Sequence, residues 1–305
     1  MELRNLRAFV EVIQRHGFSA AAKALGLTQP TISKAIQQLE HDCGGPLLAR
    51  PSRRPQLTPA GEAVYRRAIT MLAEQGRLEN DLAELSGLKR GRLRLGLPSL
   101  GSGLFAPLVA TFRRRYPEIE IELYEQGSEL LQERVRTGEI EIGSSLGPVG
   151  GEFEWQLVRE EPLVAVLPAG HALERRKAIR LMELAATPFI LFERGFLLNS
   201  VVRNACKERG FTPQEAARSG QVDFILALVA AGLGVAVLPR LIVTERGASM
   251  NVTVPIEDKD LRWRLGLIWQ RGATLSAPAR RWLDLVKEEH PPGKNVRSRN
   301  GGVPA

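Results

Sequence analysis

The sequence predicts two parts of different fold class: an all-α N-terminal part of the winged helix-turn-helix type, extended by one long helix, and a C-terminal α/β part. Three observations predict this division. Short helical patterns near the N-terminus are separated by a glycine and a cap-plus-proline signal, a long helical pattern follows them, and strand patterns alternate with helix patterns after Gly91. A chain of 305 residues with 44% hydrophobic residues is long enough for two or three domains.

The first forty residues predict three short helices. The first covers Leu3 to Arg15, with apolar residues at helical spacing, and Ser19 is expected to cap the second. Gly26 marks the reversal of the chain, and Thr28 is a good cap for the third helix. Pro30 then lies in the first turn, where its missing N–H has no cost. Two short helices around such a turn indicate a helix-turn-helix.

The third helix is predicted to have one apolar face and one polar face. Ile32, Ile36 and Leu39 recur at i, i+4 and i+7 and should face the core. The other face is rich in hydrogen-bonding groups, and the second helix of a helix-turn-helix enters the major groove, so we expect it to meet base edges and phosphates. The predicted DNA contacts on this helix are Gln29, Pro30, Thr31, Ser33, Lys34 and Gln37.

A basic β-hairpin is predicted after this helix. Two short extended pieces, 47–50 and 55–58, bracket the tip "PSRR". A wing of this kind places arginines beside a phosphate backbone or in a minor groove, and an ordinary basic loop is the alternative. The wing residues predicted to contact DNA are Arg50, Arg53 and Arg54.

The distribution of charge agrees with a polyanionic partner for this end of the chain. Residues 1–67 carry ten Lys and Arg against five Asp and Glu, and Lys294, Arg297 and Arg299 add three positive charges near the C-terminus. The whole chain has a net charge of +8, so residues 68–290 are neutral overall. A basic end beside a neutral body is typical of nucleic-acid binding, although a solvated basic face would give the same asymmetry.

Thr58 and Pro59 repeat the cap-plus-proline signal and predict a long helix to about Leu85. Its apolar positions are too sparse for the core of a monomer and suit a seam with a second copy of the chain. The predicted dimerisation residues are Ile69, Leu72, Leu78 and Leu82. A hinge is expected around Gly87, Lys89, Arg90 and Gly91.

In the chain after Gly91, strand patterns alternate with helix patterns. This alternation predicts a mostly parallel sheet. The predicted strands are 92–98, 119–127, 139–148, 162–168, 188–192, 235–239 and 261–270. The predicted helices are 104–117, 128–138, 181–185, 200–209 and 277–289, and the apolar segment 222–234 belongs to the same series. The last residues, 291–305, have the composition of a disordered tail.

The chain resembles the LysR-type transcriptional regulator family over nearly its whole length. The residues that carry the resemblance are "FSAAAKALGLTQPTISKAIQQLE", "LTPAGE", "LRLGLPS", "FRRRYPEIEIEL", "PAGHAL" and "LVAAGLGVAVLP". Two departures are "DCGGPLLAR" before the wing and Glu141, where the family usually has Asp.

The resemblance implies a winged helix-turn-helix over 1–58, a linker helix over 59–88, and an effector domain over 89–290 built of two α/β lobes like a periplasmic binding protein. Lobe I is expected to cover about 91–162 and 268–290, and lobe II about 163–267. Members usually assemble as dimers of dimers on promoter DNA.

An effector site is expected between the two lobes. By resemblance, the loop after the first strand and Ser128 face the cleft, and serine hydroxyls beside helix N-termini suit a carboxylate or phosphate. Ser128 could instead only cap its helix. The predicted effector contacts are Ser99, Leu100, Gly101, Ser102, Ser128, Ser144, Phe192 and Arg194.

Several classes of function find no support in the sequence. No GxSxG, HExxH or P-loop motif is present, and Cys43 and Cys206 form neither a disulfide framework nor a metal-binding spacing, so we expect no catalytic residues, metal or cofactor. The N-terminus lacks the features of a secretory signal, and no run of about twenty apolar residues occurs, so we expect a cytoplasmic protein without membrane contact.

The expected partners are double-stranded promoter DNA, a small-molecule effector and further copies of the chain. Two alternative functions stay open at this point: an intracellular solute-binding protein with an incidentally basic N-terminus, and a metabolic enzyme on the same two-lobed fold. Salt-dependent binding to a promoter would separate the first function from both alternatives.

Overall fold

The computed structural model describes residues 1–49, 55–85, 90–246 and 251–291. These residues form two compact units, of which one comprises Met1–Arg92 with Arg136–Ile140 and the other the rest of the chain. The predictions for Arg50, Arg53, Arg54, the hinge residues Gly87 and Lys89, and the tail from 292 onward lie outside the described residues. The other two expected hinge residues are described: Arg90 is exposed and Gly91 begins strand β1 (Gly91–Leu97).

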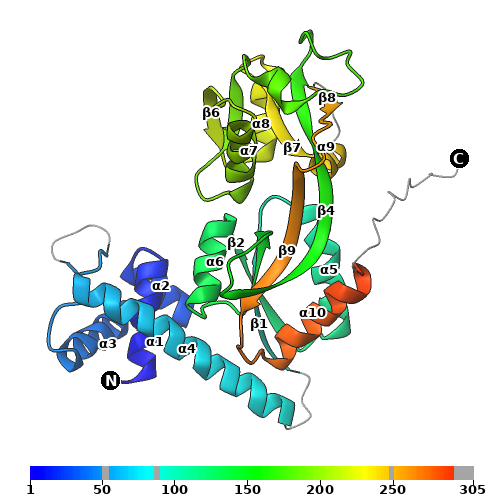
Figure 1. Ribbon diagram of the computed structural model, residues 1–305. Helices are drawn as coiled ribbons and strands as arrows, with labels where there is room; N and C mark the ends of the chain where they lie inside the picture. Colours follow the sequence, from blue (N-terminus) through cyan, green and yellow to red (C-terminus); the bar gives the residue numbers. More distant parts are fainter. Residues whose placement is uncertain (50–54, 86–89, 247–250, 292–305) are drawn as a thin grey trace, which may run out of the picture. The chain divides into compact units, whose positions relative to one another are not determined.

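The N-terminal helices form the predicted helix-turn-helix (Figure 1). Helix α1 covers Leu3–Gln14, α2 covers Phe18–Leu25 and α3 covers Gln29–Asp42. The Thr31 N–H donates to the Thr28 hydroxyl at 3.4 Å, which confirms Thr28 as the cap of α3.

The expected cap of α2 is wrong. Helix α2 begins at Phe18 with Gly17 in the cap position, and the Ala21 N–H donates to the Gly17 carbonyl at 3.1 Å. Phe18 packs against the hydrophobic core of this unit, so the chain is already helical when it reaches Ser19. Tertiary packing therefore outweighs the capping preference of the serine.

One hydrophobic core joins these helices to the base of the wing. Ile32, Ile36 and Leu39 are buried as predicted, and Phe9 packs edge-on against Tyr65 with ring centroids 6.3 Å apart. The described part of the wing is an antiparallel pair, with the bridge Leu48↔Leu57 and a bond of 2.8 Å from the Ala49 N–H to the Gln56 carbonyl. The hairpin prediction is thus confirmed up to the tip.

Helix α4 spans Pro59–Leu85, and the Gly61 N–H donates to the Thr58 hydroxyl at 3.0 Å, as the cap-plus-proline signal predicts.

The first two residues of the expected dimer seam, Ile69 and Leu72, pack inside their own unit. Ile69 is only 7% exposed in the core of its own unit and Leu72 packs against the same core, because the first half of α4 lies on α1. Among the α4 side chains that the structure describes, the large apolar ones left exposed are Met71, Leu78 and Leu82. They follow one another at helical spacing and form a single stripe.

We expect this stripe to be the seam between two copies of the chain. Leu78→Asp and Leu82→Asp would each place a charge where it is removed from water, so sedimentation velocity should show a smaller species. Ala63→Asp, at an exposed position of α4, is the matched control and should keep the wild-type size. Unchanged sedimentation of both leucine variants would contradict the seam.

The second unit contains a seven-stranded sheet in the order β2-β1-β3-β9-β4-β7, with β8 paired to β4, and a two-stranded sheet β5-β6 (Figure 1). The strands are β1 Gly91–Leu97, β2 Ile119–Glu125, β3 Ile142–Leu146, β4 Phe153–Pro168, β5 Phe189–Phe192, β6 Glu215–Ser219, β7 Ala236–Pro239, β8 Asn251–Pro255 and β9 Arg262–Gln270. The helices are α5 Ser102–Arg115, α6 Ser128–Arg136, the 3₁₀ turn η1 Leu181–Leu184, α7 Leu197–Glu208, α8 Val222–Ala230, α9 Arg240–Arg246 and α10 Ala277–Glu289.

The prediction of a mostly parallel sheet is only partly right. Pairs β1–β3 and β5–β6 are parallel, but β9 pairs antiparallel with both β3 and β4, and β4 pairs antiparallel with β7 and β8. Strand β4 carries the chain from lobe I to lobe II and β9 brings it back, so these two strands must run in opposite directions. Strand β9 pairs with β4 from Arg262 and with β3 from Leu265 onward.

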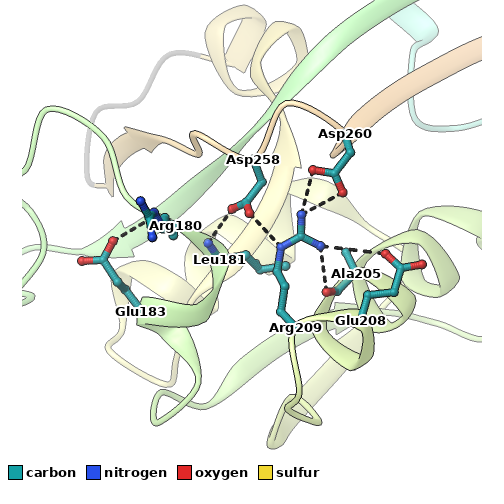
Figure 2. Close-up of polar contacts among 8 residues, drawn as sticks. All are labelled: Arg180, Leu181, Glu183, Ala205, Glu208, Arg209, Asp258 and Asp260. Carbon is teal, nitrogen blue, oxygen red and sulfur yellow. Dashed lines mark hydrogen bonds and ion pairs between the residues drawn. The ribbon is translucent and has the colours of Figure 1, made fainter.

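Arg209 joins three segments of lobe II (Figure 2). Its Nε donates to Asp258 at 2.7 Å, Nη2 donates to both carboxylate oxygens of Asp260 at 2.8 Å, and Nη1 donates to the Ala205 carbonyl at 3.0 Å. The other Asp258 oxygen accepts the Leu181 N–H at 2.7 Å. This one guanidinium thereby connects α7, the start of η1 and the segment that enters β9.

Replacing Arg209 should destabilise the protein in a pH-dependent way. Arg209→Met removes hydrogen bonds to two carboxylates, so we expect a loss of about 2 kcal/mol in the free energy of unfolding at neutral pH. The guanidinium lowers the pKa of Asp260, so this part of the stability is present above the ordinary carboxyl pKa of about 4 and is lost as the pH falls through the lowered value. Thermal unfolding between pH 7 and pH 3 checks the difference, with Arg175→Met, 95% exposed, as the control.

Candidate functional site

The outer surface of α3 carries the predicted DNA contacts. Gln29, Pro30, Thr31, Lys34 and Gln37 are exposed, and Ser33 is half-buried. The Gln29 Nε2 donates to the Ser33 hydroxyl at 3.3 Å, so these two side chains are neighbours one helical turn apart, and Gln37 follows on the same stripe. The surface of this capped helix therefore offers amide, hydroxyl and ammonium groups.

Glu40, which the sequence did not single out, fixes the base of the wing to α3. Its carboxylate accepts the backbone N–H groups of Leu47 at 2.9 Å and Leu48 at 3.3 Å. A carboxylate near the end of a helix looks like any surface acid in the sequence, and only the fold brings it to the wing.

The loop after β1 lies against the returning strand β9. Leu100 is buried, Ser99 is half-buried and Gly101 precedes α5. A Cβ atom on Gly101 would lie 3.4 Å from the Leu265 side chain and 3.6 Å from the Trp263 ring. The loop before α5, which we expected to contact an effector, thus packs against β9, a strand that links the two lobes.

A carboxylate of lobe II reaches the first turn of α5. Ser102 is the first residue of this helix and is exposed, and a Cβ atom on Gly103 would lie 2.6 Å from Glu245 Oε2. Glu245 belongs to α9, a helix that the sequence analysis did not predict. The contact places a negative charge at the positive end of α5.

The start of α6 is the second place where the lobes meet. Gly127 precedes the helix, and its carbonyl accepts the N–H groups of Leu130 and Leu131, both at 3.1 Å. Ser128 is the first helical residue and only 6% exposed. The Glu129 N–H donates to the carbonyl of Gly195 in lobe II at 3.3 Å.

The remaining predicted effector residues divide between the core and the surface. Ser144 and Phe192 are buried, and the Ser144 hydroxyl has no hydrogen-bond partner among the described residues. Phe192 stacks on Phe196 with ring centroids 5.4 Å apart, which shapes the turn that contains Arg194 and Gly195. Arg194 is exposed. The structure thus brings Ser128 next to the turn of Arg194 and buries Leu100, Ser144 and Phe192.

The cysteines are poorly suited to thiolate chemistry. Burial raises the pKa of Cys206 to about 11 and also raises the pKa of Cys43. Both thiols are therefore protonated at neutral pH. Within the part of the chain that the structure describes, no group of three or more His, Cys, Asp or Glu side chains could hold a metal ion, and no helix is long and apolar enough to cross a membrane.

Two family models together cover most of the chain. Residues 3–62 match the bacterial regulatory helix-turn-helix protein, lysR family, and residues 86–291 match the LysR substrate binding domain. The chain belongs to the LysR family. It is a transcriptional regulator with a helix-turn-helix DNA-binding domain and an effector-binding domain.

Relatives of this LysR-type regulator match it over nearly their full length. The chain is 34% identical to the uncharacterized HTH-type transcriptional regulator YwbI of Bacillus subtilis (strain 168), over 94% of this chain and 96% of YwbI. It is 31% identical to the transcriptional dual regulator GltC of the same strain, again over 94% and 96%. The crystal structure of CbnR, a LysR family transcriptional regulator, shares the fold with a TM-score of 0.68 and 24% identity, over 95% of this chain and 99% of CbnR.

Proposed function

We propose that this LysR-type regulator reads operator DNA with the polar stripe of α3 and responds to a small carboxylate held where its two lobes meet. The observation that carries the DNA part is the polar stripe on a capped helix formed by exposed Gln29 and Gln37 and half-buried Ser33. The protein acts by binding DNA and effector, without a catalytic step, in keeping with relatives that are named as regulators.

The readout residues have distinct roles. Gln29 and Ser33 make hydrogen bonds to base edges, and Lys34 contacts a guanine or a phosphate. The wing arginines at positions 50, 53 and 54 supply sequence-independent phosphate contacts. The domains are 1–58 for DNA binding, 59–88 for dimerisation and 89–290 for effector binding, and two dimers combine on DNA.

A single substitution separates base reading from general DNA affinity. Gln29→Ala should cost about 1 to 3 kcal/mol on the operator and little on random DNA, because only the base contact is lost. Fluorescence anisotropy with both DNAs measures the two affinities. Gln38→Ala is the matched control, since Gln38 is exposed on the same helix and bonds to Asp42 at 2.9 Å. Equal losses on both DNAs would exclude Gln29 from base reading.

The effector part rests on Ser128 and the start of α6. A nearly buried serine in the first turn offers a hydroxyl donor beside backbone N–H groups and the positive end of the helix, which together favour a carboxylate oxygen. Arg194 adds an exposed positive charge one residue from the Gly195 contact. Ser99, in the loop before α5, and Ser102, the first residue of α5, supply further hydroxyl groups.

Ser99→Ala and Ser128→Ala should each weaken effector binding by about 1.5 to 3 kcal/mol, the value of a hydrogen bond to a charged group, and leave effector-free operator binding intact. A thermal-shift screen of small carboxylates and their neutral amides identifies binders, and calorimetry compares the variants. Ser200→Ala, exposed on α7, is the control. If both serine variants bind the selected carboxylate as the wild type does, the site lies elsewhere.

A further inference from the structure

The two lobes meet through backbone atoms at Gly127 and Gly195. The Gly195 carbonyl of lobe II accepts the Glu129 N–H at the start of α6 in lobe I, at 3.3 Å. A Cβ atom on Gly127 would lie 2.5 Å from the Gly195 oxygen and 2.9 Å from its carbonyl carbon. Cβ atoms do not approach backbone so closely, so this contact requires glycine at position 127.

The turn that carries the Gly195 carbonyl is held by its own lobe. The Glu193 N–H donates to the Ser219 carbonyl at 3.2 Å, and the Phe196 ring stacks on the buried Phe192 ring. Gly195 has a φ of +92°, a value that favours glycine. The carbonyl is therefore presented to α6 by a preformed turn.

We propose that the Gly195 carbonyl is a built-in competitor of the effector: it occupies the N-terminus of α6 in the ligand-free protein, and a carboxylate oxygen displaces it on binding. This inference rests on the proposed function, because it concerns the same site. A neutral carbonyl at 3.3 Å is a weak acceptor, whereas a carboxylate forms charge-assisted bonds and interacts favourably with the helix dipole.

Displacement would couple binding to the arrangement of the lobes. When a ligand takes the Glu129 N–H, the hydrogen bond between the lobes is lost and the turn around Gly195 must move. Such a ligand binds the state without the Glu129–Gly195 hydrogen bond better than the state that has it. This difference in affinity shifts the equilibrium between the two states.

The experiment uses the full-length protein with acetate as the carboxylate probe and acetamide as its neutral counterpart. Gly127→Ala should push the carbonyl away, so amide exchange at Glu129, measured by mass spectrometry on short peptides, should be about three- to tenfold faster, as expected for the loss of one hydrogen bond. Acetate should bind this variant about three- to tenfold more tightly than the wild type because the competitor is removed. Acetamide should not discriminate between them.

Gly151→Ala is the matched control, because a Cβ atom there meets nothing within 4 Å and the backbone is unstrained. Gly195→Ala meets no neighbour, but its φ of +92° disfavours a side chain, so the turn should relax and shift the carbonyl from the side of lobe II. Exchange and acetate affinity should change in the same direction, which keeps the test informative if Gly127→Ala does not fold. Unchanged exchange in the variants would show that the contact is absent in solution and overturn the proposal.

Two other results also overturn it. Faster exchange with unchanged acetate affinity would mean that the carbonyl does not compete, while acetate binding itself would still support the proposed site. Acetate binding to neither wild type nor variant would refute the carboxylate site together with the displacement.

Discussion

The antiparallel pair of β4 and β9 is the interaction on which the effector domain depends. The two strands pair from Phe153↔Gln270 to Pro162↔Arg262. Beyond this stretch β4 pairs with β7 and β8, while β9 pairs with β3. Both lobes are therefore parts of one hydrogen-bonded sheet, and a change in their arrangement must bend this pair instead of separating two independent bodies. The loop before α5 rests on β9 at Trp263, so it is coupled directly to that strand.

At the lobe junction, the starts of two lobe I helices, α5 and α6, each lie beside an oxygen of lobe II. The Glu245 carboxylate lies against Gly103 at the start of α5, and the Gly195 carbonyl accepts the Glu129 N–H at the start of α6. Helix N-termini leave N–H groups without partners within the helix, and the Gly195 carbonyl satisfies one of them, the Glu129 N–H. Glycine at 103 and 127 permits the approach in both cases. The domain thus places one of its own oxygens at each of these two helix starts.

The DNA-binding unit and the effector domain differ in how far the sequence predicted them. Thr28 and Thr58 both cap the helices that follow, and the bounds of α4 agree with the prediction, because caps, prolines and helical periodicity act within a few residues. Ser19 fails as a cap and Ile69 as a seam residue, because packing of Phe18 and of α4 on α1 decides both positions. The first half of β4, β6, α9 and β8 were missed, since they are short or mixed in polarity.

The sequence by itself determined the helix-turn-helix, the long linker helix, the alternation of strands and helices, and the resemblance that the family models confirmed. These features follow from sequence patterns that span a few residues, such as caps and helical periodicity, or from motifs that occur in a fixed order along the chain. Only the tertiary structure decided the direction of β9, its pairing with β4, the Arg209 cluster and the contact of Gly127 with Gly195. Each of these joins residues that are far apart in the chain, and their proximity depends on how the whole sheet pairs, which no local period or propensity encodes.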